Sequence, residues 1–409
     1  MRAFYNARPY PPPVENLDDY SRIWQDENRR RADFHLYWSA LPYRENLTVL
    51  VAGCGTSQAV KHALRQPASR VVGIDISETS IWHTEKLKQK YKLENLETHQ
   101  LPIERVGELG YSFDKIICTG VLHHLPDPDA GLRALREVLK PEGALHLMVY
   151  ATYGRAGVYM LQEYARLLEI GNTDVEITDF ANTLMELPRE HPLAWLLGQS
   201  PDFRTKAGLA DALLNPQDRA YTVPQLFDFL RGAGLDFGRW VRQAAYLPHC
   251  GALAATKHKT RLAQLPEEKQ YAASELFRGT MLRHSLIAYR DDALGERHPV
   301  RFDGDAWLSY IPIRLPETII VRKNLPAGAK AVLINQNHTY TDLILAVDKV
   351  QLDLFKAIDN KLDISGIICR IEDAKNGERV RVFFEQLWYY DLVVFKSDTT
   401  DQVKPIQRR

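Results

Sequence analysis

One segment near the start of the chain constrains the fold more than any other. The apolar run VLVA at residues 49–52 leads directly into Gly-Cys-Gly-Thr at 53–56, and a helical stretch begins near Gln58. Glycine adopts backbone angles that other residues avoid, so Gly53 and Gly55 allow a tight turn and let a ligand approach the backbone. A buried strand, a glycine turn and a helix in this order are typical of a doubly wound α/β sheet.

The alternation of strands and helices continues beyond this turn. Short apolar runs predict strands at 48–52, 70–76, 96–101, 113–119, 144–150 and, last in the sheet, 283–290, with a turn at Pro141-Glu142-Gly143. Such strands with helices between them indicate a parallel sheet that is covered on both faces. Residues 155–215 and 257–282 are predicted to be helical insertions over one end of the sheet, where insertions commonly form a substrate lid.

An acidic residue ends the second strand. Asp75 follows the glycine turn by about 20 residues, the spacing at which a carboxylate binds ribose hydroxyls in such folds. A dinucleotide site would carry a small residue at the third glycine position, where this chain has Gln58, so the pattern argues against NAD. The simpler alternative is a strand–helix turn with Asp75 as a helix cap.

Three segments together resemble a known family. VLVAGCGTSQ, then VVGIDIS, then SFDKIICTGVLHHLPDPDAGLRALREVLKPEGALHLMVYA resemble the class I S-adenosylmethionine-dependent methyltransferases, in particular a subgroup with VAGCGT and GVLHH motifs. The resemblance covers residues 45–155 and, more weakly, 220–290. It implies a Rossmann-like sheet of about seven strands with the last antiparallel, S-adenosyl-L-methionine as the cofactor, and methyl transfer as the activity.

The resemblance also implies where the cofactor binds. Gly53 and Gly55 would pass beneath its methionine part, Asp75 would bind the ribose, and Leu101 would lie near the adenine. The whole implied set is Gly53, Cys54, Gly55, Thr56, Gln58, Asp75, Ile76, Leu101, Thr119 and Gly120. Val51 stands where many relatives carry an acid, so a neighbouring side chain or water must contact the cofactor's amino group.

Two histidines follow the fourth strand at its carboxyl end, where reacting groups lie in open α/β sheets. Methyl transfer to oxygen or nitrogen requires a proton to leave the acceptor, and histidine can accept it near neutral pH. His123 is predicted to be this base and His124 is the second candidate, the alternative being that one of them packs inward and bonds the backbone. Arg155 is predicted either to hold an anionic acceptor group or to form an ion pair. Relatives that bind a metal have glutamate where Gly120 stands, so no metal site is expected.

Residues 1–45 are predicted to be an N-terminal lid. Pro11-Pro12-Pro13 favours an extended first stretch, and a helix is predicted over 18–41. The aromatic side chains could close over the sulfonium by cation–π contact or could simply pack; they are Tyr5, Tyr10, Tyr20 and Trp24.

The polar stretch 291–300 predicts a boundary between a methyltransferase domain at 1–295 and a smaller α+β module at 301–409. This module loosely resembles a winged-helix domain, because helices are predicted at 350–359, 363–371 and 378–390 and a strand at 392–396. Its arginines stand beside glutamates, so nucleic-acid binding is not expected. Docking of a protein, a peptide or a second copy in a homodimer is the favoured role, and simple packing against the methyltransferase domain is the alternative.

Composition excludes some partners and leaves the acceptor open. Lys+Arg and Asp+Glu both number 52, so no net charge steers the chain to nucleic acid or an anionic membrane. The four cysteines lack zinc-site spacing, and neither a secretory signal nor a membrane-spanning apolar run is found, so a cytoplasmic protein is expected. The acceptor is a small molecule or a protein side chain. A methyltransferase-like scaffold without catalysis and a nucleotide-sugar or NAD enzyme are the alternatives.

Overall fold

The predicted strands form one mixed sheet in the computed structural model, which describes residues 1–199, 201–293, 300–374 and 376–397. The chain divides into two compact units: 1–22, 45–240 and 275–293 form the first, and 23–44, 241–274 and 294–409 form the second. This division differs from the predicted boundary, because residues 23–44 and 241–274 group with the C-terminal part. The domain assignment at 1–295 and 301–409 therefore stays a prediction.

The sheet of the first unit has the order β3-β2-β1-β4-β5-β8-β7, and a short strand, β6, pairs with β5. Only β8 runs antiparallel to its neighbours, as predicted for the last strand. The strands are β1 Thr48–Ala52, β2 Arg70–Asp75, β3 Leu96–Gln100, β4 Phe113–Thr119, β5 Leu139–Ala151, β6 Ala220–Tyr221, β7 Leu235–Trp240 and β8 Arg283–Arg290.

Helices join these strands, and their starts follow the local sequence. Ser77 caps α5 through the Ser80 amide, and Asp127 caps α6 through the Ala130 amide. The connecting helices are α4 Gln58–Arg65, α5 Glu78–Tyr91, η1 Ile103–Leu109, η2 Leu122–His124, α6 Pro128–Val138 and α11 Val223–Gly232.

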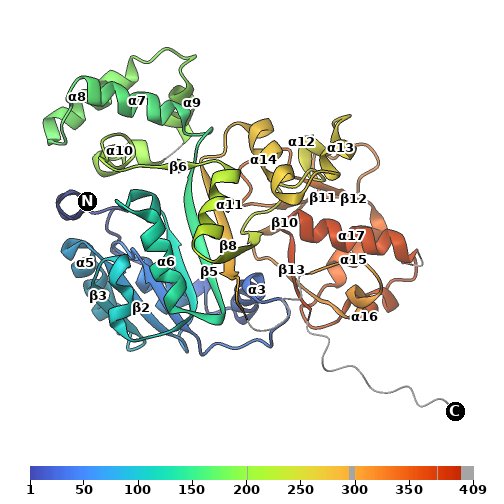
Figure 1. The fold of residues 1–409 in the computed structure, drawn as a ribbon. Helices are drawn as coiled ribbons and strands as arrows, with labels where there is room; N and C mark the ends of the chain where they lie inside the picture. Colours follow the sequence, from blue (N-terminus) through green and yellow to red (C-terminus); the bar gives the residue numbers. More distant parts are fainter. Residues whose placement is uncertain (200, 294–299, 375, 398–409) are drawn as a thin grey trace. The chain divides into compact units, whose positions relative to one another are not determined.

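The insertion at 155–215 is helical, as predicted. It comprises α7 Ala156–Leu167, α8 Asp174–Met185, α9 Pro192–Gln199, η3 Pro201–Arg204 and α10 Lys206–Leu213. These helices share an apolar cluster of their own that includes Phe180 and Leu213, and Phe4 from the N-terminus joins it. Figure 1 shows α7 to α10 as a lobe beside the end of the sheet, with the N-terminus close by.

Three local predictions were wrong. The first stretch contains a helix, α1 Arg2–Ala7, because the prolines at 11–13 restrict only themselves and the residue before them. The helix predicted over 18–41 is two helices, α2 Asp18–Ile23 and α3 Glu27–Tyr37. The predicted turn at 141–143 lies within β5, where pairing with β4 passes from Leu139 to Ala144 and leaves an irregularity between them.

The second unit contains the predicted C-terminal helices, α15 Lys349–Ala357, α16 Ile364–Cys369 and α17 Gly377–Tyr389, followed by β13 Val393–Lys396. Two small sheets were not predicted: β13 pairs with β9 Ile311–Arg314, and β10 Thr318–Val321, β11 Ala331–Asn335 and β12 Leu345–Val347 form an antiparallel sheet. The remaining helices are η4 Ala306–Ser309, α12 Gly251–Ala254, α13 Lys259–Ala263 and α14 Glu267–Arg278, the last of which crosses into the first unit.

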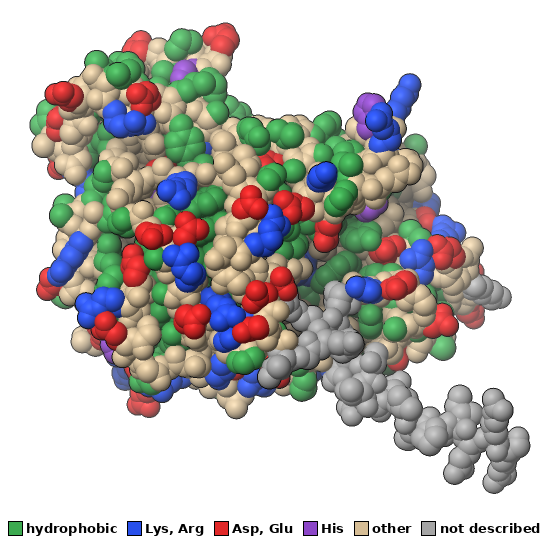
Figure 2. All heavy atoms as spheres, in the orientation of Figure 1, with side chains coloured by type: hydrophobic (Ala, Val, Ile, Leu, Met, Phe, Trp, Pro, Cys, Tyr) green, Lys and Arg blue, Asp and Glu red, His purple; other side chains and the backbone are tan. Residues whose placement is uncertain are grey.

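Two surface properties bear on partners. None of the helices in the described part of the chain has the length and hydropathy of a bilayer-spanning segment. On the face drawn in Figure 2, acidic and basic side chains are interspersed, in keeping with the balanced composition.

Candidate active site

The predicted cofactor-binding residues come together at one edge of the sheet. Ala52 lies opposite Ile74, and Asp75 lies opposite Gln100, so β1, β2 and β3 end side by side. The segments that follow these strands begin with Gly53, Ile76 and Leu101. Thr119 ends β4, which neighbours β1 on the other side. The carboxyl ends of parallel strands are where ligands bind in open α/β sheets.

The glycine turn is shaped for a ligand that approaches its backbone. Gly53 and Gly55 have φ angles of +69° and +53°, which side chains disfavour. A Cβ on Gly53 would lie 2.4 Å from a Val121 methyl group, and one on Gly55 would lie 3.1 Å from Pro11 Cδ. Cys54 is fully buried, and burial raises the pKa of its thiol well above the usual value. Only its backbone is therefore available at the turn.

Asp75 accepts two backbone hydrogen bonds in addition to any from a ligand. Its Oδ2 accepts from the Gly55 amide at 2.8 Å, and its Oδ1 accepts from the Ser77 amide at 2.9 Å. Burial raises the pKa of this carboxyl group. A carboxylate has about four lone-pair positions, so two remain for ribose hydroxyls. The residues at this edge fit the cofactor that the family implies.

His123 lies in η2 and is 1% exposed. Its ring centroid is 3.9 Å from that of Tyr150 on β5. Among the described residues neither ring nitrogen has a hydrogen-bond partner. Burial, reinforced by His124 and Arg155, lowers the pKa of His123 well below its ordinary value. The ring is therefore neutral near pH 7 and able to accept a proton, although it is a weak base.

His124 is also buried, and its Nδ1 lies 2.7 Å from the Gln217 carbonyl oxygen. Because a carbonyl oxygen only accepts, Nδ1 donates to it. The Asn215 amide nitrogen lies 3.3 Å from the same Nδ1, which makes that contact one of packing. The inward, backbone-bonded alternative for one histidine of the pair thus describes the geometry of His124.

Arg155 is 8% exposed and forms an ion pair, the alternative to binding an anionic acceptor group. Its Nη2 lies 3.1 Å from Asp218 Oδ2, and its guanidinium lies 3.5 Å from the Tyr150 ring centroid. Gln162 donates to the same Asp218 oxygen at 2.9 Å. Direct recognition of an acceptor by Arg155 remains a prediction.

Several polar groups near the histidines were missed by the sequence reasoning, and all lie in or just after the insertion: Gln162, Asp211, Asn215, Gln217 and Asp218. Buried polar atoms that lack a hydrogen-bond partner among the described residues include those of His123, Thr152, Gln217 and Asp218. Buried polar groups are normally hydrogen-bonded, so such a concentration indicates a place where a ligand supplies the partners. The polar turn NPQD at 215–218, which ends the apolar α10, was the one signal in the sequence.

The buried histidines and the nearby aspartate could in principle bind a metal cation. Ligand atoms of His123, His124 and Asp218 lie within 4.8 Å of one another. The guanidinium of Arg155 on Asp218 disfavours a second positive charge there. The expectation of no metal stays a prediction.

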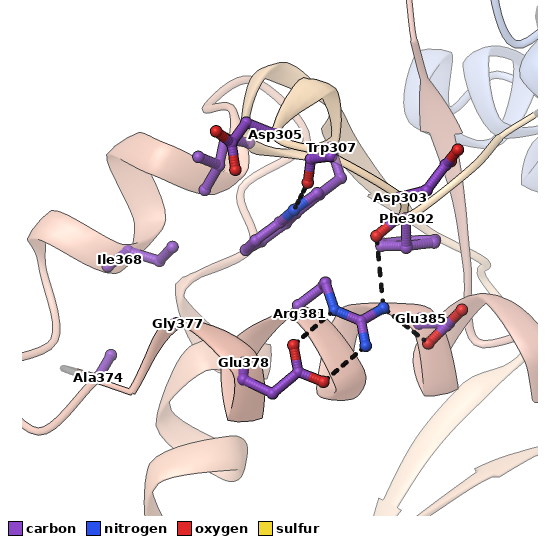
Figure 3. A pocket seen from close by; sticks show the side chains of 12 residues that line it. Phe302, Asp303, Asp305, Trp307, Ile368, Ala374, Gly377, Glu378, Arg381 and Glu385 are labelled. Atoms are coloured by element: carbon purple, nitrogen blue, oxygen red, sulfur yellow. Dashed lines mark hydrogen bonds and ion pairs between the residues drawn. The ribbon is translucent and has the colours of Figure 1, made fainter.

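The second unit has a separate cavity of about 740 Å³ (Figure 3). Arg381 lies within it, donating to both carboxylate oxygens of Glu378 and to the Phe302 carbonyl oxygen. Trp307 forms part of the wall and donates to the Gly304 carbonyl oxygen. Two of the four acids that line the cavity, Glu378 and Glu385, accept hydrogen bonds from Arg381, and none of the predicted site residues lines it.

Comparison with known proteins agrees with this geometry. Residues 50–145 match the model of a methyltransferase domain. The chain is 31% identical to an uncharacterised protein of Synechococcus over 58% of either chain, and 32% identical to a ubiquinone biosynthesis O-methyltransferase of Neisseria meningitidis over 26% of this chain and 50% of that protein. The chain thus spans between half and about three fifths of the length of these relatives.

A solved structure, PKMT2 from Rickettsia typhi, is similar over 94% of this chain and 76% of its own, with a TM-score of 0.63 and 16% identity, and it has also been solved in complex with AdoHcy. At this identity the likeness shows the fold. The sheet order and the matched segment together identify a class I methyltransferase domain, and the cofactor of this class is S-adenosylmethionine.

Proposed function

We propose that this chain transfers the methyl group of S-adenosylmethionine to an acceptor that binds beside His123. The observation that carries the proposal is the group of buried polar atoms around His123 and Asp218, near the glycine turn, for which the described residues supply no hydrogen-bond partner. Val121, two residues before His123, packs directly on Gly53. The cofactor edge and this cluster are therefore adjacent in the first unit.

The cofactor, when bound, supplies a methyl group on a sulfonium, whose transfer needs chiefly in-line placement of the acceptor. Asp75 and the glycine turn hold the cofactor end of the site. The Tyr150 ring, whose centroid lies 3.9 Å from that of His123, packs against the His123 ring and positions it. His123, neutral near pH 7, takes up the proton of an oxygen or nitrogen acceptor at one of its two ring nitrogens. The acceptor is a small molecule or a protein side chain.

The test uses the full chain and has two parts. Titration calorimetry with S-adenosylhomocysteine checks cofactor binding, and incubation with methyl-labelled cofactor and fractionated cell extract checks transfer. Binding together with label in one fraction, reduced in His123→Ala, is the expected result. Binding without transfer to any fraction would indicate a scaffold, and no binding would refute the proposal.

A further inference from the structure

The N-terminal helix α1 contacts the cofactor edge of the first unit on one side. The Asn6 side-chain oxygen accepts a hydrogen bond from the Ser77 hydroxyl at 2.9 Å, and its carbonyl oxygen accepts from Thr79 at 3.1 Å. Ser77 also donates its amide to Asp75. Asn6 is therefore two hydrogen bonds from the predicted ribose-binding carboxylate.

The segment after α1 covers the glycine turn itself. The Thr56 hydroxyl donates to the Pro11 carbonyl oxygen at 2.9 Å. A Cβ on Gly55 would lie 3.3 Å from the Tyr10 carbonyl oxygen. Residues 10 and 11 thus lie directly on the turn that would hold the cofactor.

On its other side α1 belongs to the helical insertion. Phe4 is part of the apolar cluster of α7 to α10, and Arg8 pairs with Asp174 at 2.8 Å. The Tyr5 hydroxyl donates to Asp211 Oδ1 at 3.0 Å and accepts from the Asn215 amide at 3.2 Å. Asn215 in turn touches His124.

The Tyr5 hydroxyl is chemically suited to hold this network. Burial, followed by the charge of Asp211, raises the pKa of Tyr5 well above its ordinary value, so the hydroxyl keeps its proton and stays a donor. Asp211 is 3% exposed, and it also accepts a longer hydrogen bond, at 3.4 Å, from the Asn215 amide. Loss of the Tyr5 hydroxyl would leave a buried carboxylate short of a donor, which is costly.

We infer that Tyr5 is a positioning residue that couples the cofactor edge to the acceptor cluster. Tyr5 and Asn6 are neighbours on one turn of helix, so α1 cannot shift against Ser77 without moving the Tyr5 hydroxyl relative to Asp211. A ligand that orders the glycine turn and Asp75 therefore also orders α10, Asn215 and the His124 side of the acceptor cluster. The inference rests on the proposed function, because it takes that ligand to be the methyl-transfer cofactor.

Hydrogen–deuterium exchange of the full chain with and without S-adenosylhomocysteine tests this coupling. In the wild type we expect slower exchange at 49–58 and 70–80, which adjoin the ligand, and about fivefold or more slower exchange at 206–219, which the Tyr5 hydroxyl joins to α1 through Asp211 and Asn215. In Tyr5→Phe, protection of the first two segments should persist while that of 206–219 is lost. Tyr164→Phe, on an exposed tyrosine of α7, is the matched control and should behave as wild type.

The outcomes separate the two proposals. Two results would overturn the coupling and leave the proposed function intact. One is equal protection of 206–219 in the wild type and in Tyr5→Phe, and the other is no protection of 206–219 in a wild type whose glycine turn is protected. A wild type with no ligand protection at the glycine turn would remove the proposed function and the coupling with it. Asp211→Ala, which keeps the Tyr5 side chain and removes the oxygen that accepts from its hydroxyl, should give the same loss at 206–219 if Tyr5→Phe is too unstable to measure.

Discussion

Replacement of Asp75 by alanine should weaken cofactor binding more than any other single change at the sheet edge. The carboxylate sits at the end of β2 with one oxygen on the Gly55 amide and the other on the Ser77 amide. Each oxygen has a further lone-pair position, and two ribose hydroxyls would occupy them. Alanine removes the acceptor for all four donors.

The size of the loss follows from these bonds. Hydrogen bonds to a charged group contribute about 1.5–3 kcal/mol each, and closing the site over unpaired hydroxyls adds a desolvation cost. Because water can fill the space left by the carboxylate and bond the hydroxyls in its place, part of this energy is recovered, and we expect a net loss of roughly 2–4 kcal/mol in binding free energy, or about 30- to 700-fold in Kd at 1.4 kcal/mol per tenfold. The two released backbone amides should also lower the stability of the free protein.

Titration calorimetry with S-adenosylhomocysteine measures the effect, with circular dichroism to show that the variant is folded. Glu78→Ala is the matched control, since Glu78 is an exposed acid three residues further along the chain, in the first turn of α5. A folded Asp75→Ala variant that binds within about twofold of wild type would refute the assignment of Asp75 to the ribose.

Three further predictions follow from other parts of the molecule. His123→Ala should lower turnover by roughly 10²–10⁴-fold with S-adenosylhomocysteine affinity unchanged, and an equal loss of ligand binding would point to a structural role instead. Because the pKa of His123 is depressed, the wild-type rate should not fall near pH 6.5 through protonation of this residue. Deletion of residues 301–409 should give an insoluble chain, because it uncovers Ala32, which packs on Ile313 and Val394, and Cys250, which lies in the C-terminal core. Gel filtration and calorimetry measure the outcome, and a soluble truncation that binds ligand would support the boundary at 291–300. Burial lowers the pKa of His35 to about 4, so below pH 6.5 the unfolded state binds a proton that the folded state does not, and the free energy of unfolding should fall by up to about 3 kcal/mol between pH 6.5 and 4. Thermal unfolding of His35→Asn should depend less on pH than that of the wild type, and an equal dependence would contradict the reasoning.

Most of the fold was accessible from the sequence because its signals are local. The apolar runs of β4 and β8 were predicted with the bounds that the structure has. Other signals also depend on only a few neighbouring positions in the chain. They are the glycines in left-handed conformations, the acid at the end of β2 and the residues that cap helices. The small sheets of the second unit were not predictable in this way, because β9 and β13 are paired across about 80 residues of chain.

The same distinction between local and long-range signals applies to the two parts of the site. The cofactor edge could be predicted because each residue follows its own strand, and parallel strands bring their carboxyl ends together. The acceptor cluster could not, since Asp218 meets Arg155 across 63 positions and Tyr5 meets Asp211 across 206. No spacing rule joins residues of an insertion to a histidine pair in the short helix that follows β4.

By itself, then, the sequence determined the doubly wound sheet, the glycine turn, Asp75 as the acid beside it, and two histidines at the edge where chemistry occurs. Only the tertiary structure decided that a backbone carbonyl holds His124, that the His123 nitrogens have no partner within the described part of the chain, and that Arg155 is paired with Asp218. It also decided that α1 lies between the glycine turn and the insertion. The physical reason is that backbone conformation is set by neighbours in the chain, whereas burial, pairing and pKa are set by whatever packing brings alongside.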